Sequence, residues 1–541
     1  MTTTMARLAQ PAARAVQHLL TPRRVRPLAV SFASPIACPL MLALLLCAPA
    51  TRAENWRFTP TLELSETYTD NVALREDAFK QGQWVTEITP GFQVNMRGPR
   101  LTMDAHFRLQ YFAMPDNDIS GTNRSARSGQ GALRANVIDD LLYVDASAGI
   151  AQRGVSPFGQ IITDNNFASA NRAEVKTWRV SPYLVHRFGP RANAELRYAH
   201  DEVDAGSSGL GNTTGDLLSL QVTSGVAFRT VGWGVVLSQQ NIRDSLAGDT
   251  SIKNANLNLR YRAGRTLNLL GGIGYDEYDY NSLGGATGGA AWNVGAAWTP
   301  SLRTSVQGTV GRRYYGPSRS LSALHRSRHT VWSINFDDSV VSTRSNFLLP
   351  ATIDTAGLLD RLFMPTYADP AERARAVQEY IRSTGLPASL ADNVNFFSNR
   401  YSLQKQLRAS AAFKRGRSSA VLGLYKVRRE ALSVSQSDSP ILGTNISSLN
   451  ENVDQSGLNA TLNYRLTGRT SFNLVSDVVR SNSLKSGLES RSSAVRFTMR
   501  HQLAARLIGA LSVRHVEGNG ALLGGRSYTE NAVSASLSMQ L

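Results

Sequence analysis

From residue 56 onward the chain alternates apolar and polar side chains with a period of two. The segment 101–113 is the clearest case. A strand places successive side chains on opposite faces, whereas a helix would mix these two sets. The pattern therefore predicts amphipathic strands over almost the whole chain. The apolar set of this segment is Leu101, Met103, Ala105, Phe107, Leu109 and Tyr111, and the polar set is Thr102, Asp104, His106, Arg108 and Gln110.

Two kinds of connection separate the strands. Short basic turns such as Arg97-Gly-Pro-Arg100 and Lys414-Arg-Gly-Arg417 alternate with long polar loops such as 152–173 and 430–452. The repeating unit is a strand, a tight turn, a strand and a long loop. Counting these units predicts 22 strands, within a range of 18–24, if Asp337-Asp338 is a tight turn; without that turn the count is one lower.

A soluble sandwich and a transmembrane barrel both alternate in this way. Strands of about ten residues or more have the length that a tilted strand needs to cross a bilayer. Turns that are short at one end and long at the other are typical of outer-membrane barrels. We therefore predict an all-β fold, a single large antiparallel transmembrane β-barrel over residues 54–541. Its expected partners are outer-membrane lipid and the barrel-assembly machinery, which would read the apolar strand Val533–Leu541.

One segment, 349–394, breaks the period of two. Asp369-Pro-Ala-Glu372 has the residues of a helix start, and Gly385 with Pro387 ends it, so we predict a helix over 370–384. Asp354 to Phe363 is a second, shorter helical candidate. Loops of this length are usually functional or disordered. Two interpretations stay open: a plug folded into the lumen, and an external lid.

Residues 1–53 have the order of a secretory signal peptide. They contain six Arg and no acidic residue, then an apolar stretch, then small residues. We expect cleavage after Ala53, with Ala50 as the second choice and an uncleaved anchoring helix as the alternative. Both cysteines, Cys38 and Cys47, lie in this segment, so thiol chemistry is not expected beyond it. Strand alternation begins by Phe58, so a receptor with a separate amino-terminal plug domain is not expected.

Net charge and motifs exclude several function classes. The formal charge of the 541 residues is +17, but the basic excess is spread along the chain, so no nucleic-acid partner is expected. No phosphate loop, nucleophile elbow or zinc spacing appears. We therefore predict no catalytic residues, no cofactor and no metal site, and a protein that is not an enzyme.

Two candidate sites remain. The first is a sugar-contact rim, or calcium site, whose alternative is an interfacial girdle with a solvated acidic edge; it consists of Tyr275, Asp276, Glu277, Tyr278 and Tyr280. The second is a set of lumen-facing basic residues that would line an anion-preferring pathway. Its alternative is internal salt bridges with carboxylates such as Asp104 and Glu195. The members named are Arg108, Arg179, Arg197, Arg260, Arg408 and Arg428.

Five segments, 56–60, 64–71, 88–92, 97–100 and 330–344, resemble a family called PEP-CTERM system-associated. Thr67-Tyr-Thr-Asp-Asn71 is the distinctive part. The resemblance implies an outer-membrane protein of a Gram-negative bacterium, linked to exosortase and exopolysaccharide loci, with polysaccharide and periplasmic export components as partners. It implies no catalytic or binding residue.

Three hypotheses follow. The first is an accessory of exopolysaccharide export or surface assembly, acting as conduit or scaffold. The second is a diffusion porin for small anionic or sugar solutes. The third is a barrel hydrolase acting on lipid or glycan.

Overall fold

A computed structural model describes residues 55–114, 124–160, 171–205, 211–245, 248–348, 353–364, 400–433, 452–520 and 526–541, with Arg373, Ala376, Val377, Tyr380, Ser389 and Leu390. The predicted signal segment 1–53 and most of the predicted helix 370–384 lie outside the described residues. The four described positions within that helix, 373, 376, 377 and 380, are helical.

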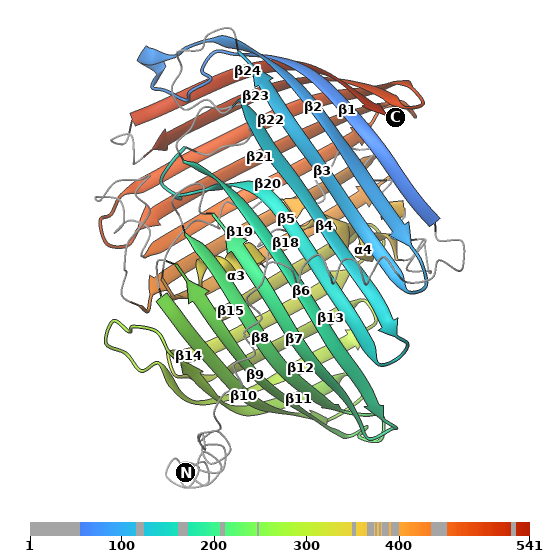
Figure 1. The fold of residues 1–541 in the computed structure, drawn as a ribbon, viewed down its shortest axis with the longest axis vertical. Coiled ribbons are helices and arrows are strands. Elements are labelled where there is room, and N and C mark those ends of the chain that lie inside the picture. Colours follow the sequence, from blue (N-terminus) through green and yellow to red (C-terminus); the bar gives the residue numbers. More distant parts are fainter. Residues whose placement is uncertain are drawn as a thin grey trace, which may run out of the picture.

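The strands form one closed antiparallel barrel (Figure 1). Twenty-two strands belong to a single sheet, which confirms the predicted fold class and strand number. The first strand pairs with the second and also with the last, where Thr61–Thr69 lie opposite residues 532–540. Closure leaves no sheet edge with unpaired backbone groups, as a membrane-spanning sheet requires. The strands are β1 (Asn55–Thr69), β2 (Gln83–Arg97), β3 (Leu101–Ala113), β4 (Ser125–Ile138), β5 (Leu142–Gly154), β6 (Arg172–Phe188), β7 (Ala192–Asp204), β8 (Asn212–Ser224), β9 (Val231–Asp244), β10 (Gly248–Arg262), β11 (Leu267–Tyr278), β12 (Gly288–Ser301), β13 (Thr304–Arg313), β14 (Gly316–Arg326), β15 (Thr330–Val341), β18 (Ser402–Arg415), β19 (Ser418–Ala431), β20 (Val453–Arg465), β21 (Thr470–Ser483), β22 (Glu489–Ala504), β23 (Leu507–Gly520) and β24 (Arg526–Gln540).

The two ends of the barrel differ. The short-turn rim carries the turns at 98–100, 189–191, 263–266, 416–417 and 466–469, and the long-loop rim carries the loops 70–82, 155–171, 279–287 and 342–401. Gly189 and Gly416 adopt φ of +56° and +57°, so both use the left-handed conformation that a glycine in a tight turn provides. The predicted difference between the two ends is therefore present.

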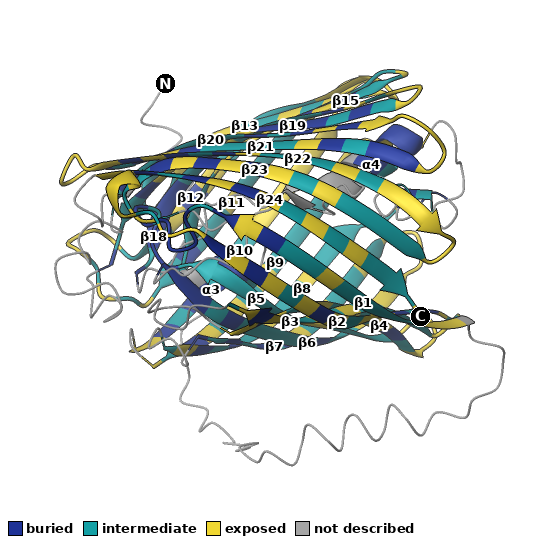
Figure 2. Ribbon diagram, turned by 90° about the horizontal axis from the view of Figure 1, so that it is seen from above, coloured by how far each residue is buried: buried dark blue, intermediate teal, exposed yellow. Residues whose placement is uncertain are grey.

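The outward face of the wall is apolar. On β3, Tyr111 is 50% exposed whereas its neighbour Phe112 is 6% exposed, because the two side chains point to opposite faces. The same alternation exposes Trp332, Leu422 and Val513 on distant strands. Figure 2 shows exposed positions following the strands around the outside. Apolar residues that face outward from a closed barrel need an apolar solvent, and a bilayer provides it.

The prediction of a tight turn at Asp337-Asp338 is wrong. β15 runs through both residues, which pair with Gln406 and Lys405 of β18. The structure instead has a two-residue link, Tyr314–Tyr315, between β13 and β14, followed by Gly316 at φ +118°. This short link lies at the long-loop rim, where the pattern predicts long polar loops.

The described parts of the loop 342–401 lie in the lumen. The loop contains α3 (Thr343–Leu348), α4 (Thr355–Phe363) and a small pairing of β16 (Ile353–Asp354) with β17 (Ser389–Leu390). α4 confirms the predicted short helix. A 3-10 turn, η1 (Asp77–Phe79), lies in the loop 70–82.

No helix within the described ranges is both long and apolar enough to cross a membrane.

Candidate functional site

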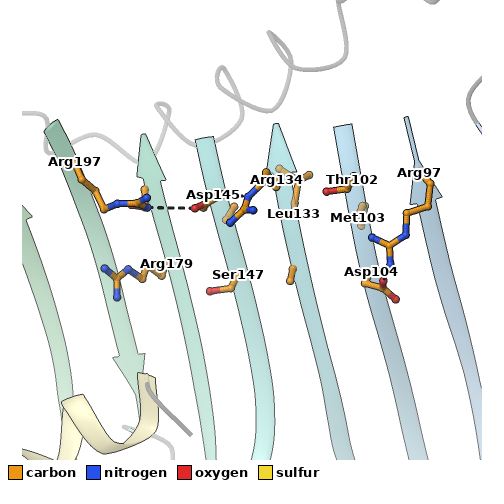
Figure 3. A pocket seen from close by; sticks show the side chains of 13 residues that line it. Arg97, Thr102, Met103, Asp104, Leu133, Arg134, Asp145, Ser147, Arg179 and Arg197 are labelled. Atoms are coloured by element: carbon orange, nitrogen blue, oxygen red, sulfur yellow. Dashed lines mark hydrogen bonds and ion pairs between the residues drawn. The ribbon is translucent and has the colours of Figure 1, made fainter. Parts of the chain in front are cut away.

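The lumen wall formed by β2 to β7 has a basic hollow near the short-turn rim (Figure 3). We call it the arginine hollow; its volume is about 540 Å³. Its charged side chains come from six neighbouring strands and point inward because they alternate with the lipid-facing set. They are Arg97, Asp104, Arg134, Asp145, Arg179 and Arg197.

Ion pairs fix most of these arginines. The Nη2 atom of Arg97 lies 2.5 Å from Oδ2 of Asp104. Asp145 accepts from Nε of Arg134 at 2.9 Å and from Nη1 of Arg197 at 3.3 Å. Arg197 also binds Glu195, so three carboxylates face the four guanidinium groups of the hollow, which keeps a positive surplus of one.

Three further side chains hold Arg197: Ser181, Tyr183 and Glu195. Arg197 donates to Oγ of Ser181 at 3.0 Å, and its guanidinium carbon lies 3.9 Å from the ring centroid of Tyr183. Glu195 accepts from its Nε at 2.8 Å. Such a fixed guanidinium loses little side-chain entropy when an anionic group binds.

Arg179 differs from the others. It lines the hollow beside Ser147 and Ser181, and among the residues that the structure describes no carboxylate lies within ion-pair distance of it. Its guanidinium is therefore free to bind a carboxylate or phosphate, for which its planar fork is well suited. Arg179 and Arg197 are two of the predicted lumen-facing basic residues, and the structure brings them together.

The remaining predicted arginines are dispersed. Arg108 lies on β3, a strand of the hollow, on the same inward face as Asp104 and four residues from it. Arg260 on β10 and Arg408 on β18 also face inward, but their strands do not line the hollow. Arg428 does not face the lumen, which corrects the prediction. It pairs with Lys405 on the outward face of β19, where it binds Glu430, and the neighbouring Arg429 points inward.

The predicted sugar-contact rim is divided by the strand. Asp276 and Tyr278 point into the lumen, whereas Tyr275 and Glu277 point outward, where Glu277 accepts from Lys253 at 3.0 Å. Tyr280 follows the end of the strand. The five predicted residues therefore do not form one surface, because a strand sends alternate side chains to opposite faces.

The inward half of this segment belongs to a tyrosine cluster at the lumen mouth. Tyr280 stacks on Tyr401 with ring centroids 5.1 Å apart, and Tyr278 lies 5.1 Å from Tyr314. Tyr315 joins through Tyr314. The sequence reasoning missed Tyr314, Tyr315 and Tyr401; the adjacent pair Tyr314-Tyr315 before Gly316 was the available signal.

The tyrosine cluster is neutral and self-packed. Burial raises the pKa of Tyr280, Tyr314, Tyr315 and Tyr401, so all four phenols stay protonated at physiological pH. Because the rings cover one another, their faces offer less stacking surface to a sugar than the sequence predicts. The cluster presents packed aromatic rings and neutral phenol groups, of which Tyr280 and Tyr314 lie 3.5 Å apart.

α3 is fixed to the wall formed by β6 and β7 at the long-loop rim. Phe347 packs among Val155, Val175 and Val203. Arg344, which is 4% exposed, forms a buried ion pair with Asp201 on β7. Gly215 on β8 leaves room for this contact, since a Cβ there would lie 1.9 Å from the Arg344 Nη2 atom.

α4 lies lower in the lumen, towards the short-turn rim. Leu359, Leu362 and Phe363 pack against three inward residues of β15, β18 and β19: Val331, Ala412 and Val421. Lys414 places its ammonium 3.7 Å from the ring centroid of Phe363 and 4.8 Å from that of Tyr380. Of the two interpretations for the long loop, the described residues therefore occupy the position of a plug.

The segment Thr67–Asn71, the distinctive part of the family resemblance, lies at the barrel seam, where the first strand meets the last. Thr69 donates to Glu530 of β24 at 2.7 Å, and Glu530 is held by Arg514 in two contacts at 2.7 and 3.1 Å. Asn71 donates to the Thr529 carbonyl at 2.9 Å. The contacts of this segment join the first strand to the last, so they stabilise the closed barrel.

No family model matches the sequence, and no curated protein is similar to it. Solved structures with a related architecture include siderophore receptors called PirA. The protein from Pseudomonas aeruginosa has 10% identity and a TM-score of 0.43, over 91% of this chain and 81% of that chain. The protein from Acinetobacter baumannii has 8% identity and a TM-score of 0.46, over 89% and 80%. The FrpB iron transporter from Neisseria meningitidis has 10% identity and a TM-score of 0.45, over 89% and 82%. These likenesses carry no inference about what the present chain binds.

Proposed function

We propose that this protein is an outer-membrane β-barrel that serves as a gated conduit in exopolysaccharide export or surface assembly at a PEP-CTERM/exosortase locus. One observation carries the conduit: the two described helices of the loop 342–401 lie inside the barrel and are fixed at two heights. α3 is attached by the Arg344–Asp201 pair, and α4 by Leu359, Leu362 and Phe363. The resemblance at residues 64–71 and 330–344 supports the link to exopolysaccharide.

The chemistry of the wall supports a polar, anionic cargo. A hydrated polymer that carries carboxylates or phosphates would meet the arginine hollow, with Arg179 as its free cation. Hydroxyl groups would meet the serines beside it. The same hollow favours the second candidate, an anion-selective diffusion porin, whose lumen would have to be open at rest.

The experiment measures the ion conductance of the refolded protein in a planar bilayer, with and without residues 349–394. We expect a closed intact protein and a conducting deletion variant, because the deletion removes α4 and its contacts. A deletion of residues 434–451, in the loop between β19 and β20, is the matched control and should stay closed.

Secretion gives the second readout. A strain that lacks the gene should lose extracellular polymer and regain it with the intact chain. A steady large conductance of the intact protein, with normal secretion in the deletion strain, would favour the porin. Silence of both purified forms, with far-UV spectra of a folded β protein, would contradict transport through the lumen.

A further inference from the structure

The outward face of the barrel carries a row of charged side chains at the long-loop rim. Strand register aligns them, because Asp338 of β15 lies opposite Lys405 of β18 and Lys405 opposite Arg428 of β19. Arg428 in turn lies opposite Asp454 of β20. We call this row, with its outward neighbours Arg312, Arg319, Lys426 and Glu430, the outer basic patch.

Cations outnumber carboxylates in the outer basic patch. Glu430 binds both Lys405 at 3.2 Å and Arg428 at 2.7 Å, so one carboxylate is shared by two cations. Asp454 lies 3.8 Å from Lys426, whose side chain is 63% exposed. Arg312 and Arg319 add two more cations on β13 and β14. The patch therefore has positive charge available for an external anion.

On the wall formed by β6 to β11, outward acidic side chains outnumber exposed basic ones at the same rim. On β6 to β11 the exposed outward cations are Lys176, Arg243 and Lys253, and each lies within 4 Å of a carboxylate; Arg172 shares this face of β6 but is buried. Additional carboxylates leave that wall with an acidic excess; the outward acids are Glu174, Glu202, Asp204, Asp216 and Glu277. The positive surplus is thus a local feature of β13 to β20 and not a property of the whole rim.

An apolar surface begins directly beside the patch. Leu321, Leu407 and Leu424 each lie two residues from a patch cation on the same outward face, and they are 39%, 42% and 49% exposed. Two residues along a strand span roughly 7 Å. A ligand with an anionic head and apolar chains would contact both surfaces at once.

We propose that the outer basic patch binds the phosphate groups of a phosphorylated glycolipid in the outer leaflet, whose acyl chains lie on the leucines below. The proposal rests on the membrane placement given under the proposed function, because the long-loop rim of such barrels faces the cell exterior. Bridging Lys and Arg side chains would hold the barrel in one orientation relative to its surrounding lipid.

The test titrates bisphosphorylated lipid A onto the full chain purified in a neutral detergent and counts bound lipid by native mass spectrometry. The test variant is Lys405→Gln/Lys426→Gln/Arg428→Gln. At about 1 kcal/mol per surface cation, loss of three predicts lipid A binding that is weaker by about 100-fold. The matched control, Lys176→Gln/Arg243→Gln/Lys253→Gln on the acidic wall, should bind as tightly as the unmodified chain.

Two further probes decide the ligand class. Dephosphorylated lipid A should bind the unmodified chain as weakly as lipid A binds the test variant. Equal binding of phosphorylated and dephosphorylated lipid A would overturn the proposal. Binding of phosphatidylglycerol as tight as that of lipid A would also overturn it, because the patch would then be a general anion surface. Heat-modified mobility on SDS gels checks that each variant is folded. Because binding is measured in detergent, a failure here leaves the conductance result intact, and the reverse also holds.

Discussion

On a barrel strand, neighbouring residues face different solvents, so the register decides what each charge does. Arg428 and Arg429 are adjacent, yet the first is outward in the outer basic patch and the second is inward and 3% exposed. The sequence alone presents two arginines at one strand end. Their roles follow only from the partners across the sheet, Lys405 and Gln404.

Arg179 is expected to control ion selectivity. In the variant that lacks residues 349–394, Arg179→Gln removes a lumen cation with no ion pair among the described residues, so anion preference should fall. The reversal potential under a salt gradient measures this, and we expect the anion-to-cation permeability ratio to fall at least twofold. Arg428→Gln is the matched control, since that side chain is outward. An equal change in both variants would show that the hollow does not set selectivity.

Glu530 is expected to stabilise the barrel seam. It is fully buried and holds Arg514 and Thr69, so Glu530→Gln removes the negative charge that Arg514 binds in two contacts. Breaking one side of a buried pair costs about 3–5 kcal/mol. The loss should appear as a lower temperature of heat modification on SDS gels. Glu66→Gln, on the outward face of the same seam, should leave that temperature almost unchanged.

At the scale of elements, alternation predicted the strands, and helix signals predicted α4. What they did not predict is α3 or its binding site. Gly215 has no distinguishing mark in the sequence, since its function depends on Arg344, which is far along the chain but adjacent in space. The turn Tyr314–Tyr315 was equally hard to predict, because aromatic residues are unusual in a two-residue link.

Gly215→Ala is expected to release α3. The new Cβ would lie 1.9 Å from the Arg344 Nη2 atom, so the guanidinium must leave Asp201. Overpacking of this kind costs about 1–3 kcal/mol. We expect openings that the intact protein lacks, recorded as single-channel events. Gly271→Ala is the control, because a Cβ there meets nothing within 4 Å; similar openings in both variants would contradict a role for the Arg344–Asp201 pair.

At the scale of the whole molecule, the lumen contributes to stability as well as to permeation. Closure through β1 and β24 completes the hydrogen-bond network of the sheet. The closed sheet encloses a lumen, whose apolar inward residues are covered only if another part of the chain packs on them. α4 fills part of it and gives three inward residues, Val331, Ala412 and Val421, an apolar contact. A barrel of this strand number without such a filling would enclose a wide channel.

Removal of residues 349–394 is therefore expected to lower stability while keeping the barrel. The deletion removes Leu359, Leu362 and Phe363, so Val331 and Val421 of the wall lose their apolar cover. Loss of burial costs about 1.5–3 kcal/mol for each such side chain. We expect a lower unfolding temperature by far-UV circular dichroism with unchanged β content. An unchanged temperature would mean that α4 packs without stabilising the wall.

The sequence by itself determined the class of this protein: an alternating pattern, two kinds of connection and a strand count that closes into a barrel. These are local properties, because side-chain alternation and turn chemistry act over a few residues. The tertiary structure alone decided which arginines meet, where the described helices of the loop 342–401 lie and which residues seal the seam. The contacts of these helices and of the seam join residues more than a hundred positions apart, such as Arg344 with Asp201 and Thr69 with Glu530, and their register is set only when the sheet closes.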